Sequence, residues 1–486
     1  MMTTANIGSE KSFVFDVIER NKKAIALVGD SIFYFGEVGM QEYETSGLLT
    51  GLLEEEGFSV ERGISGFPTG FLATFGSGGP VIAMHTEYDA NPENSQVPGA
   101  TTRTEIVAGA PGHCEGHNVN GAVMLAGAIA VKRAMDKFDL AGTLKVFGAP
   151  AEEQLLSRPY FVRDGHFDDV DVAMHDHVSH EFGTVYGITH SALVSAQFIF
   201  HGEASHASVT PWKGRDALDA VVLMDMGMAQ YREHMEPTMR VHRVITEGGH
   251  QPNVIPARAS VWWYFRDLTA DGARSLFERG KKIAEGAALM TNTDYETKVL
   301  SAVWPVRANQ TLAEIIQSNT ELVGMPEWTD DEQDFARQLQ QAAESTVEGL
   351  RSHIKPLDGP AEQRAPSNDC GDVSWVVPMG RVSFPSNVPN VGFHHWAAGS
   401  ALATSVAHKG AVAGAKALAA SIVDLLVDPG LVEQAKKTFE HELGGIVYRS
   451  LLPPDQDPPA ALNREMMEAF RPLMREHYVK EKPVFV

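Results

Sequence analysis

The sequence predicts an α/β protein built from two domains. Short apolar runs bounded by glycine or proline alternate with segments of helical periodicity, as in parallel sheets covered by helices. Groups of histidine and carboxylate residues follow several of these runs. The chain has 486 residues, of which 43% are hydrophobic. A chain of this length is too long for one hydrophobic core of ordinary size, so two domains are expected.

The first part of the chain alternates strands and helices. Apolar residues between Phe13 and Leu27 recur at spacings of three and four, which is typical of a helix packed on one face. Later apolar runs are short and end at glycine or proline, as buried strands do. The predicted elements are helices at 13–27, 42–55 and 121–135, strands at 70–75, 80–85 and 142–147, and a loop rich in Pro, Gly and Thr at 90–111.

The pattern changes near Ser191 and changes back near Trp304. The alternating strands and helices of this segment indicate an inserted two-layer α/β domain. Within it, His206 is the candidate for a chemical role. We therefore expect a catalytic domain formed by 1–190 and 307–486, with the inserted domain at 191–306. The inserted elements are strands at 192–200, 240–246 and 259–266 and helices at 214–233 and 270–289; the later catalytic part has helices at 329–348, 403–426 and 463–477, a loop at 358–372 and an extended segment at 451–459.

Composition excludes several classes of partner. The net charge is -23, from 63 acidic and 40 basic residues, and no run rich in Lys and Arg is present, so we expect no nucleic acid and no anionic membrane as partner. The sequence contains no uninterrupted apolar window of about 18 residues, so we expect no membrane span. The two cysteines, Cys114 and Cys370, are expected to be free thiols, which favours a soluble protein of the reducing cytoplasm.

Four segments together indicate a metal site assembled from distant parts of the chain. They are Gly112–Asn118 (GHCEGHN), Pro150–Glu153 (PAEE), Asp176–His177 and Phe393–Trp396 (FHHW). Imidazoles and carboxylates are the side chains that hold divalent metals, and turns after strands are where such ligands converge.

These four segments occur together with further motifs, and in all of them the chain resembles the aminoacylase/carboxypeptidase superfamily of di-metal peptidases, in particular its amidohydrolase branch. The resemblance implies a three-layer α/β/α catalytic sandwich of the phosphorylase/hydrolase type, with an inserted ferredoxin-like lid that pairs two protomers into a homodimer or larger assembly. The motifs run in order through nearly the whole chain: 63–69 (GISGFPT), 87–89 (EYD), 112–118, 150–153, 205–207 (SHA), 214–220 (GRDALDA), 253–256 (NVIP) and 371–375 (GDVSW).

The resemblance also implies roles for individual residues. Glu152 matches the general base that takes a proton from a metal-activated water, and Asp89 matches an acidic residue that supports the metal centre from beside it. His206 and Asn253, on the lid, match groups that polarise the scissile carbonyl, with the histidine delivered across the dimer interface. The positions that match metal ligands are His117, Glu153, His177 and His394.

One position departs from the branch. Two residues before His117 the branch carries a cysteine ligand, and this chain carries Glu115, with its cysteine displaced to Cys114. We include Glu115 among the expected ligands, and a second-sphere hydrogen-bonding role is the alternative. A carboxylate in place of a thiolate favours Mn²⁺ over Zn²⁺, at one or two ions per subunit. A rearranged ligand set has further candidates nearby, which are His85, His113, His175, His180 and His395.

Two reactions and one non-catalytic role fit these residues. The first is hydrolysis of the amide bond of an N-acyl or N-aroyl amino acid, with a small substrate that carries a carboxylate. The second is hydrolytic deamination of an aromatic amine of the nitroanthranilate type, which the altered position Glu115 motivates. The third is a non-catalytic partner subunit, which the presence of Glu152 disfavours. Arg258 is a candidate for binding the substrate carboxylate, and Cys114 is expected to be a packed residue without a nucleophilic role.

Overall fold

A six-stranded sheet forms the centre of the computed structural model, which describes residues 8–364 and 366–486. Its strand order is β1-β2-β4-β3-β5-β12, and β4, β3, β5 and β12 run parallel to one another while β1 and β2 pair antiparallel. The strands are β1 (Ser59–Arg62), β2 (Phe71–Ser77), β3 (Val81–Thr86), β4 (Gly142–Gly148), β5 (Val172–Ser179) and β12 (Met379–Pro385). The carboxyl ends of the parallel strands therefore meet at one edge of the sheet.

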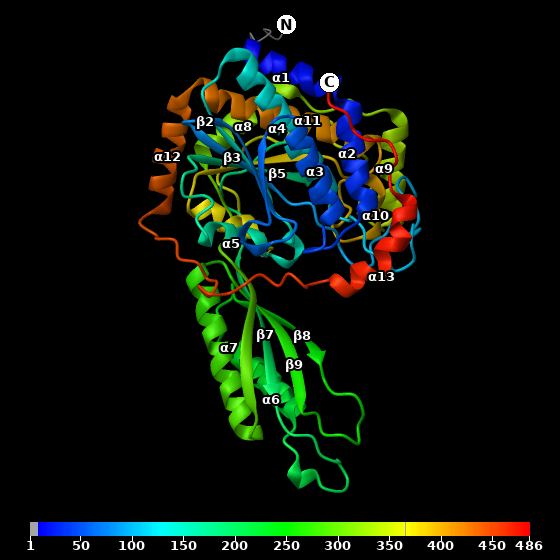
Figure 1. Cartoon of the computed structure of the whole chain (residues 1–486), viewed down its shortest axis with the longest axis vertical. Helices are drawn as coiled ribbons and strands as arrows, with labels where there is room; N and C mark the ends of the chain where they lie inside the picture. The colour runs from blue at the N-terminus through cyan, green and yellow to red at the C-terminus, as the bar shows by residue number, and fades with distance from the viewer. Residues whose placement is uncertain (1–7, 365) are drawn as a thin grey trace.

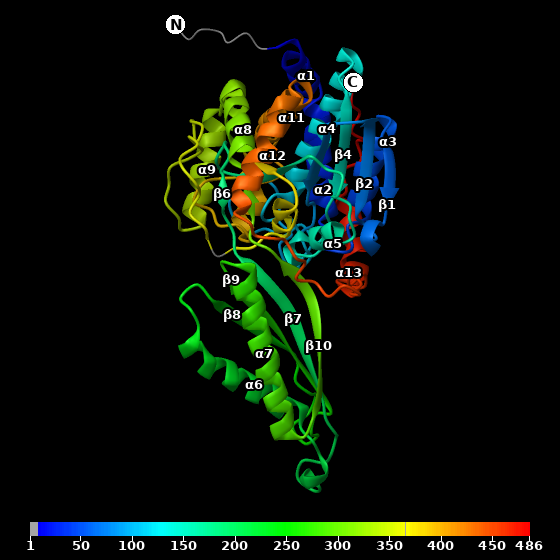
Figure 2. The ribbon, with the colours of Figure 1, turned by 90° about the vertical axis from the view of Figure 1, so that its left-hand side faces the viewer.

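Long helices cover one face of this sheet (Figure 2). They are α1 (Ser9–Arg20), α2 (Lys22–Phe35), α3 (Tyr43–Glu55), α4 (His117–Phe138), α8 (Gln310–Val323), α11 (Ser405–Val427) and α12 (Pro429–Leu443). The other face is covered by a thinner layer that includes α5 (Ser157–Arg163) and the 3-10 turns η5 (Asp369–Gly371) and η6 (Val373–Trp375), where Phe161 of α5 packs against Phe147 of β4.

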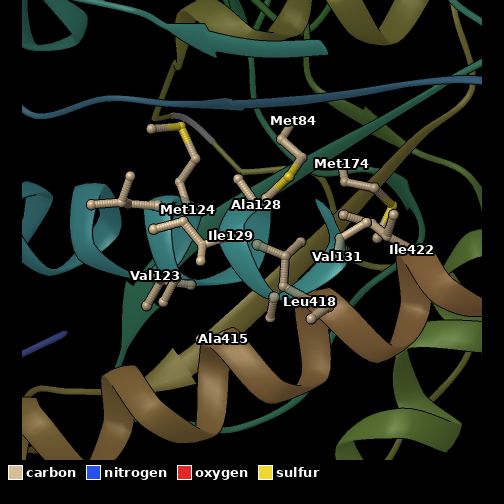
Figure 3. Close-up of a cluster of buried hydrophobic side chains, with 14 of the residues drawn as sticks. Met84, Val123, Met124, Ala128, Ile129, Val131, Met174, Ala415, Leu418 and Ile422 are labelled. Carbon is tan, nitrogen blue, oxygen red and sulfur yellow. The ribbon is translucent and has the colours of Figure 1, made fainter. Parts of the chain in front are cut away.

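Helix α4 lies between the sheet and α11, and small residues make this possible. Figure 3 shows Met84 and Met174 of the sheet, Val123 and Ile129 of α4, and Leu418 of α11 within one cluster. A Cβ atom added at Gly127 would lie 3.2 Å from Met84 and 3.3 Å from Leu418, so a larger residue there would crowd both side chains. This packing holds the first residue of α4, His117, at the edge where the strands end.

Helix α11 is long and apolar enough to cross a membrane, with a mean hydropathy of 1.7. However, 78% of its most apolar window is buried inside the protein, where α11 contacts α4, α1, α8 and β12. These are the properties of a core helix, whose whole surface must match apolar neighbours.

The smaller sheet, with the order β10-β7-β9-β8, belongs to the segment 192–303, which we call the lid. Its β-α-β-β-α-β succession and this strand order are those of a ferredoxin-like fold. The lid projects from the catalytic domain in both views (Figures 1 and 2). Its elements are β7 (Ala192–His201), α6 (Ala217–Tyr231), β8 (Arg240–Glu247), β9 (Arg258–Asp267), α7 (Ala270–Thr291) and β10 (Asp294–Val303).

The remaining elements are short or lie at the periphery. Residues 445–463 run without helix or strand along the junction with the lid, as the proline-rich composition predicts, and Trp304 Nε1 donates to the carbonyl of Arg449 there at 2.9 Å. The elements not yet given are β6 (Gly187–Ile188) paired with β11 (Arg307–Ala308), α9 (Asp330–Ala342), α10 (Trp396–Ala401), α13 (Arg464–Met474), and the turns η1 (Ile64–Gly66), η2 (Glu152–Gln154), η3 (Pro211–Lys213), η4 (Arg232–His234) and η7 (Arg475–His477).

Candidate metal centre

The segments predicted to converge do meet at the carboxyl edge of the large sheet. Glu87 to Asp89 follow β3, Glu152 and Glu153 follow β4, and His177 lies near the end of β5. The loop before α4 brings Glu115, α4 itself begins with His117, and the loop before α10 brings His394. Ligand sites of open α/β sheets occupy this edge because loops from separate strands lie side by side there.

The loop geometry explains how two neighbouring glutamates face one site. Ala151 and Leu155 adopt left-handed conformations, with φ of 59° and 58°, on either side of the turn η2. The amide of Ala151 donates to the buried carboxylate of Glu42 at 2.8 Å, which holds this strained turn. This tight turn places both Glu152 and Glu153 just after the carboxyl end of β4.

His117 is held so that one ring nitrogen faces the cluster. Its Nδ1 lies 3.1 Å from Asp89 Oδ1, and the other oxygen of Asp89 accepts from the amide of Glu153 at 2.9 Å. A carboxylate at Nδ1 fixes the tautomer of a metal-binding histidine and leaves Nε2 for the metal. His117 Nε2 is buried and has no hydrogen-bond partner among the residues that the structure describes. Asp89 thus contacts both His117 and the Glu153 turn from beside the cluster.

Glu115 lies among three imidazoles. Its Oε1 is 3.5 Å from His177 Nε2, and its Oε2 is 3.0 Å from His394 Nε2 and 4.0 Å from His117 Nε2. Although burial opposes ionisation, the hydrogen bond from His394 and the charge of His117 lower the pKa of Glu115 to about 2. The preceding Cys114 points elsewhere, with Sγ 3.1 Å from Asn91 Oδ1, and burial raises the pKa of this thiol. The displaced cysteine is thus a packed, free thiol, as predicted, and Cys370 is free as well.

The two glutamates of η2 complete the cluster. Glu153 Oε2 lies 3.3 Å from His394 Nε2, and Glu152 Oε2 lies 3.8 Å from His117 Nε2. Burial and the charge of Glu115 raise the pKa of Glu153 to about 7, and burial raises the pKa of Glu152 well above its usual range. Carboxylates crowded together out of water favour a cation among them.

Three overlapping groups of donor atoms lie close enough to hold an ion. In each group the atoms are within 4.8 Å of one another, and the groups are Glu87, His117 and His177; Glu115, Glu153 and His394; and His117, Glu152 and Glu153. All five ligands predicted from the sequence are in this set. Within residues 8–364 and 366–486, the buried Oε1 of Glu153 also has no partner, so at least two buried donor atoms of the cluster lack a hydrogen bond there.

Glu87 is a member that sequence reasoning did not assign a role. It is fully buried, its Oε1 lies 3.5 Å from His177 Nε2, and its carboxylate pairs with Arg158 and with His175 at 3.0 Å. Arg158 also pairs with the buried Asp369. We call Glu87, Arg158, His175 and Asp369 the buried ion network. The available signal was the EYD motif, in which Glu87 precedes Asp89 by two residues.

The extra histidines considered for a rearranged ligand set have other partners. His113 contacts the carbonyl of Ile32 at 3.1 Å, and His395 caps α10 by accepting from the amide of Ala397. His85 accepts from Arg158 Nε at 3.0 Å, and its ring stacks on His175. None of these, and not His180, belongs to a donor group among the residues that the structure describes.

The lid residues are remote from this cluster in the same chain. The amide of Ala207 donates to the carbonyl of Asn253, and an isolated β-bridge pairs His206 with Val254. His206 and Asn253 therefore lie close together, beyond the end of β7. Strand β7 spans ten residues from the domain junction, which is about 30 Å. Arg258 is at this far end, paired with Glu247 at the surface, so it lies away from the cavity of its own subunit.

A cavity of about 750 Å³ opens in front of the cluster. Its volume suits a small organic substrate. The lining includes Glu115, Glu152, Glu153, His177 and His394 of the cluster, together with Tyr264, Arg266, Arg364 and Arg381. Acidic and basic groups thus face the same space.

Comparison with known proteins agrees with this arrangement. The family model described as the peptidase dimerisation domain, of the M20 group, matches residues 188–290, within which most of the lid lies. The chain is 34% identical over 472 residues to one of the subunits of p-aminobenzoyl-glutamate hydrolase from Escherichia coli strain K12, and the match covers 92% of this chain and 98% of that protein.

Solved structures share the fold. The aminobenzoyl-glutamate utilization protein of Klebsiella pneumoniae superposes with a TM-score of 0.59 at 16% identity, over 83% of this chain and 97% of that one. A dinuclear metal-binding peptidase of the M20 family from Bacillus subtilis gives 0.51 at 20% identity, over 85% and 99%. The site geometry, the dimerisation-domain match and the identity over nearly the whole length together show that this chain belongs to the M20 family and is a metal-dependent amidohydrolase.

Proposed function

We propose that the protein hydrolyses the amide bond of an N-acyl or N-aroyl amino acid, with p-aminobenzoyl-glutamate as the model substrate. The observation that carries the proposal is the position of Glu152. This buried carboxylate belongs to no described ion pair with Lys or Arg, lies 3.8 Å from His117 Nε2 and lines the cavity of about 750 Å³. The relative that is 34% identical is named for this substrate.

The donor set fits a divalent metal. Two buried donor atoms, His117 Nε2 and Glu153 Oε1, have no hydrogen-bond partner in the described part of the chain, and the three donor groups found there consist of carboxylates and imidazoles. When bound, such an ion lowers the pKa of a water molecule to about 7 and polarises the scissile carbonyl. We propose Mn²⁺ or Zn²⁺, at one or two ions per subunit, held by Glu115, His117, Glu153, His177 and His394.

Glu152 then acts as the proton carrier. Its position on the cavity wall, 3.8 Å from His117 Nε2, suits a group that takes a proton from the attacking water and gives it to the leaving nitrogen. Because Glu152 is buried beside the cluster, the proton stays within hydrogen-bonding reach of the reacting atoms. Breakdown of the tetrahedral adduct releases the carboxylic acid and a free amino acid.

Product analysis tests the reaction. The Mn²⁺-loaded protein is incubated with p-aminobenzoyl-glutamate, other N-acyl amino acids and anthranilates, and nitrogen products are identified by mass spectrometry. We expect a free amino acid from the first two groups. Ammonia from an anthranilate would instead assign the chain to aromatic deamination, and no turnover at any metal loading would favour a non-catalytic role.

The substitution Glu115→Cys tests the metal preference. A thiolate replaces a hard oxygen donor, so we expect the variant to shift its preference from Mn²⁺ toward Zn²⁺ by at least about tenfold in relative affinity. Competition between the two metals, followed by elemental analysis of the protein, measures the shift. Glu362→Gln, at the rim of the same cavity, is the matched control. An unchanged preference would remove Glu115 from the ligand set.

We further propose a homodimer in which each lid serves the partner's site. His206 and Asn253 lie about 30 Å from the cavity of their own subunit, since β7 begins at the junction and these residues lie beyond its end. A second copy related by twofold symmetry is the simplest source of these groups. Both cysteines are free, and we propose the cytoplasm as the compartment.

Mixing two inactive variants tests this arrangement. His206→Ala and Glu152→Gln should each have little activity alone. If His206 acts across the interface, each mixed dimer regains one complete site, and an equal mixture after subunit exchange recovers about one quarter of the native activity. Glu152→Gln mixed with a double variant of both residues is the control, which recovers nothing. Absence of recovery with His206→Ala, despite verified exchange, would contradict delivery in trans.

A further inference from the structure

The wall of the cavity also contains Arg381, which pairs with no carboxylate among the described residues. Arg381 lies on β12, in register with His175 of the neighbouring β5. Side chains alternate along a strand, so Arg381 and Ser383 share the face of His175, His177 and Ser179. Arg381, Ser383, His177 and Ser179 all line the cavity. Arg381 therefore faces the same space as the metal cluster.

The contacts of Arg381 leave its charge uncompensated. Its Nη1 lies 3.5 Å from His190 Nε2, and its Nε is buried with no partner. Within residues 8–364 and 366–486, no carboxylate lies at ion-pair distance from its guanidinium. A partly buried cation without an anion costs free energy, and this cost is relieved when an anion binds.

His190 holds the guanidinium without neutralising it. Arginine can only donate, so His190 Nε2 is the acceptor and the proton of the neutral ring is on Nδ1, which lies 2.7 Å from Thr189 Oγ1. The Thr189 hydroxyl in turn donates to the carbonyl of Val306 at 3.4 Å. This chain of hydrogen bonds keeps His190 neutral and orients one edge of Arg381.

The other cations near the cavity are committed elsewhere or lie at its rim. Lys355 pairs with Glu181 at 2.9 Å, and Arg266 donates to Ser367 at 2.8 Å while its guanidinium lies over the Tyr264 ring. Arg364 is exposed at the rim. Among the described residues that line the cavity, Arg381 is therefore the cation with which an anionic ligand would pair.

We propose that Arg381 binds the α-carboxylate of the amino acid part of the substrate. The inference rests on the proposed function and names the anchor on the leaving-group side. The planar guanidinium offers parallel N–H donors that match a carboxylate in two-point contact. With the scissile carbonyl at the cluster and the carboxylate at Arg381, the amide lies between the cluster and Arg381. The site should therefore reject the corresponding carboxamide.

Ligand binding to a protein that cannot turn over tests this assignment separately from catalysis. The Mn²⁺-loaded Glu152→Gln protein is titrated calorimetrically with N-benzoyl-glutamate, its α-amide and its γ-amide. We expect the acid to bind at least about 30-fold more tightly than the α-amide, and Arg381→Gln in the same background to remove this difference. Arg381→Lys should retain part of it, because charge remains while the two-point contact is lost.

A matched variant separates a specific contact from general electrostatics. Arg364→Gln removes one positive charge from the rim of the same cavity and should change the acid-to-amide ratio less than about threefold, since exposed charges are screened. A ratio in Arg381→Gln equal to that of the parent would overturn the proposal even if the enzyme hydrolyses the panel. A ratio near one in the parent protein would also overturn it. Conversely, a ratio that depends on Arg381 would support the anchor even if no amide were hydrolysed.

Discussion

Glu152→Gln is expected to lower kcat by at least about 10³-fold while the protein keeps its metal. The substitution preserves the size of a buried side chain, so folding should be unaffected. It removes the group that carries the proton, and the residues proposed as ligands remain. Steady-state kinetics with p-aminobenzoyl-glutamate and elemental analysis of the same sample measure the two quantities together.

Two controls sharpen this prediction. Glu152→Asp keeps a carboxylate but withdraws it by one methylene, so part of the activity should remain. Glu362→Gln removes a carboxylate from the rim of the same cavity and should leave kcat within about twofold. If Glu152→Gln kept native kcat, Glu152 would not be the base. If it lost both activity and metal, Glu152 would be a ligand, as its membership of one donor group allows.

Arg158→Met should have the largest effect on stability, about 3 to 5 kcal/mol in the free energy of unfolding. Arg158 is completely buried and pairs with Glu87 and Asp369, which are also completely buried. Although burial opposes ionisation, the charge of Arg158 holds the pKa of Glu87 well below its usual range. Removing the guanidinium would leave two carboxylates together without a counter-charge. Equilibrium unfolding in urea measures the loss.

An exposed arginine provides the matched comparison. Arg62 pairs with Glu54 at 2.6 Å, but both side chains are nearly half exposed, so Arg62→Met should cost less than about 1 kcal/mol. If Arg158→Met does not accumulate as folded protein, adding Glu87→Gln and Asp369→Asn should restore folding by removing the unpaired charges. A loss from Arg158→Met no greater than that from Arg62→Met would refute the importance of the buried ion network.

The sequence predicts the lid more completely than the large sheet. Each of its predicted strands has an apolar run bounded by turn residues, and the predicted strand at 192–200 and helix at 270–289 agree with β7 and α7 within two residues. The pattern does not single out β5 and β12 because polar residues with chemical roles, such as His175, His177 and Arg381, interrupt their apolar character. Function here overrides the pattern that normally reveals a strand. The periodic stretch 13–27 is also two helices, α1 and α2, separated at Asn21.

The site shows the same limit. The five residues expected to be metal ligands lie in short sequence motifs, and the structure brings all five together in one cluster. The buried ion network escaped prediction because Arg158 is 71 residues from Glu87 and 211 from Asp369, and nothing local marks their pairing. Likewise, Arg258 and Arg381 look alike in sequence. Only the fold shows that Arg258 has a surface partner and that Arg381 faces the cavity.

Hydrolysis of p-aminobenzoyl-glutamate in ¹⁸O-labelled water, with metal added stepwise to the metal-free protein, tests the central claim most directly. We expect glutamate without label and p-aminobenzoate with one ¹⁸O in its carboxyl group, formed in proportion to metal up to one or two equivalents per subunit. Label on the aromatic ring with release of ammonia, or glutamate release that is independent of metal, would contradict a metal-dependent amidohydrolase with Glu152 as its base.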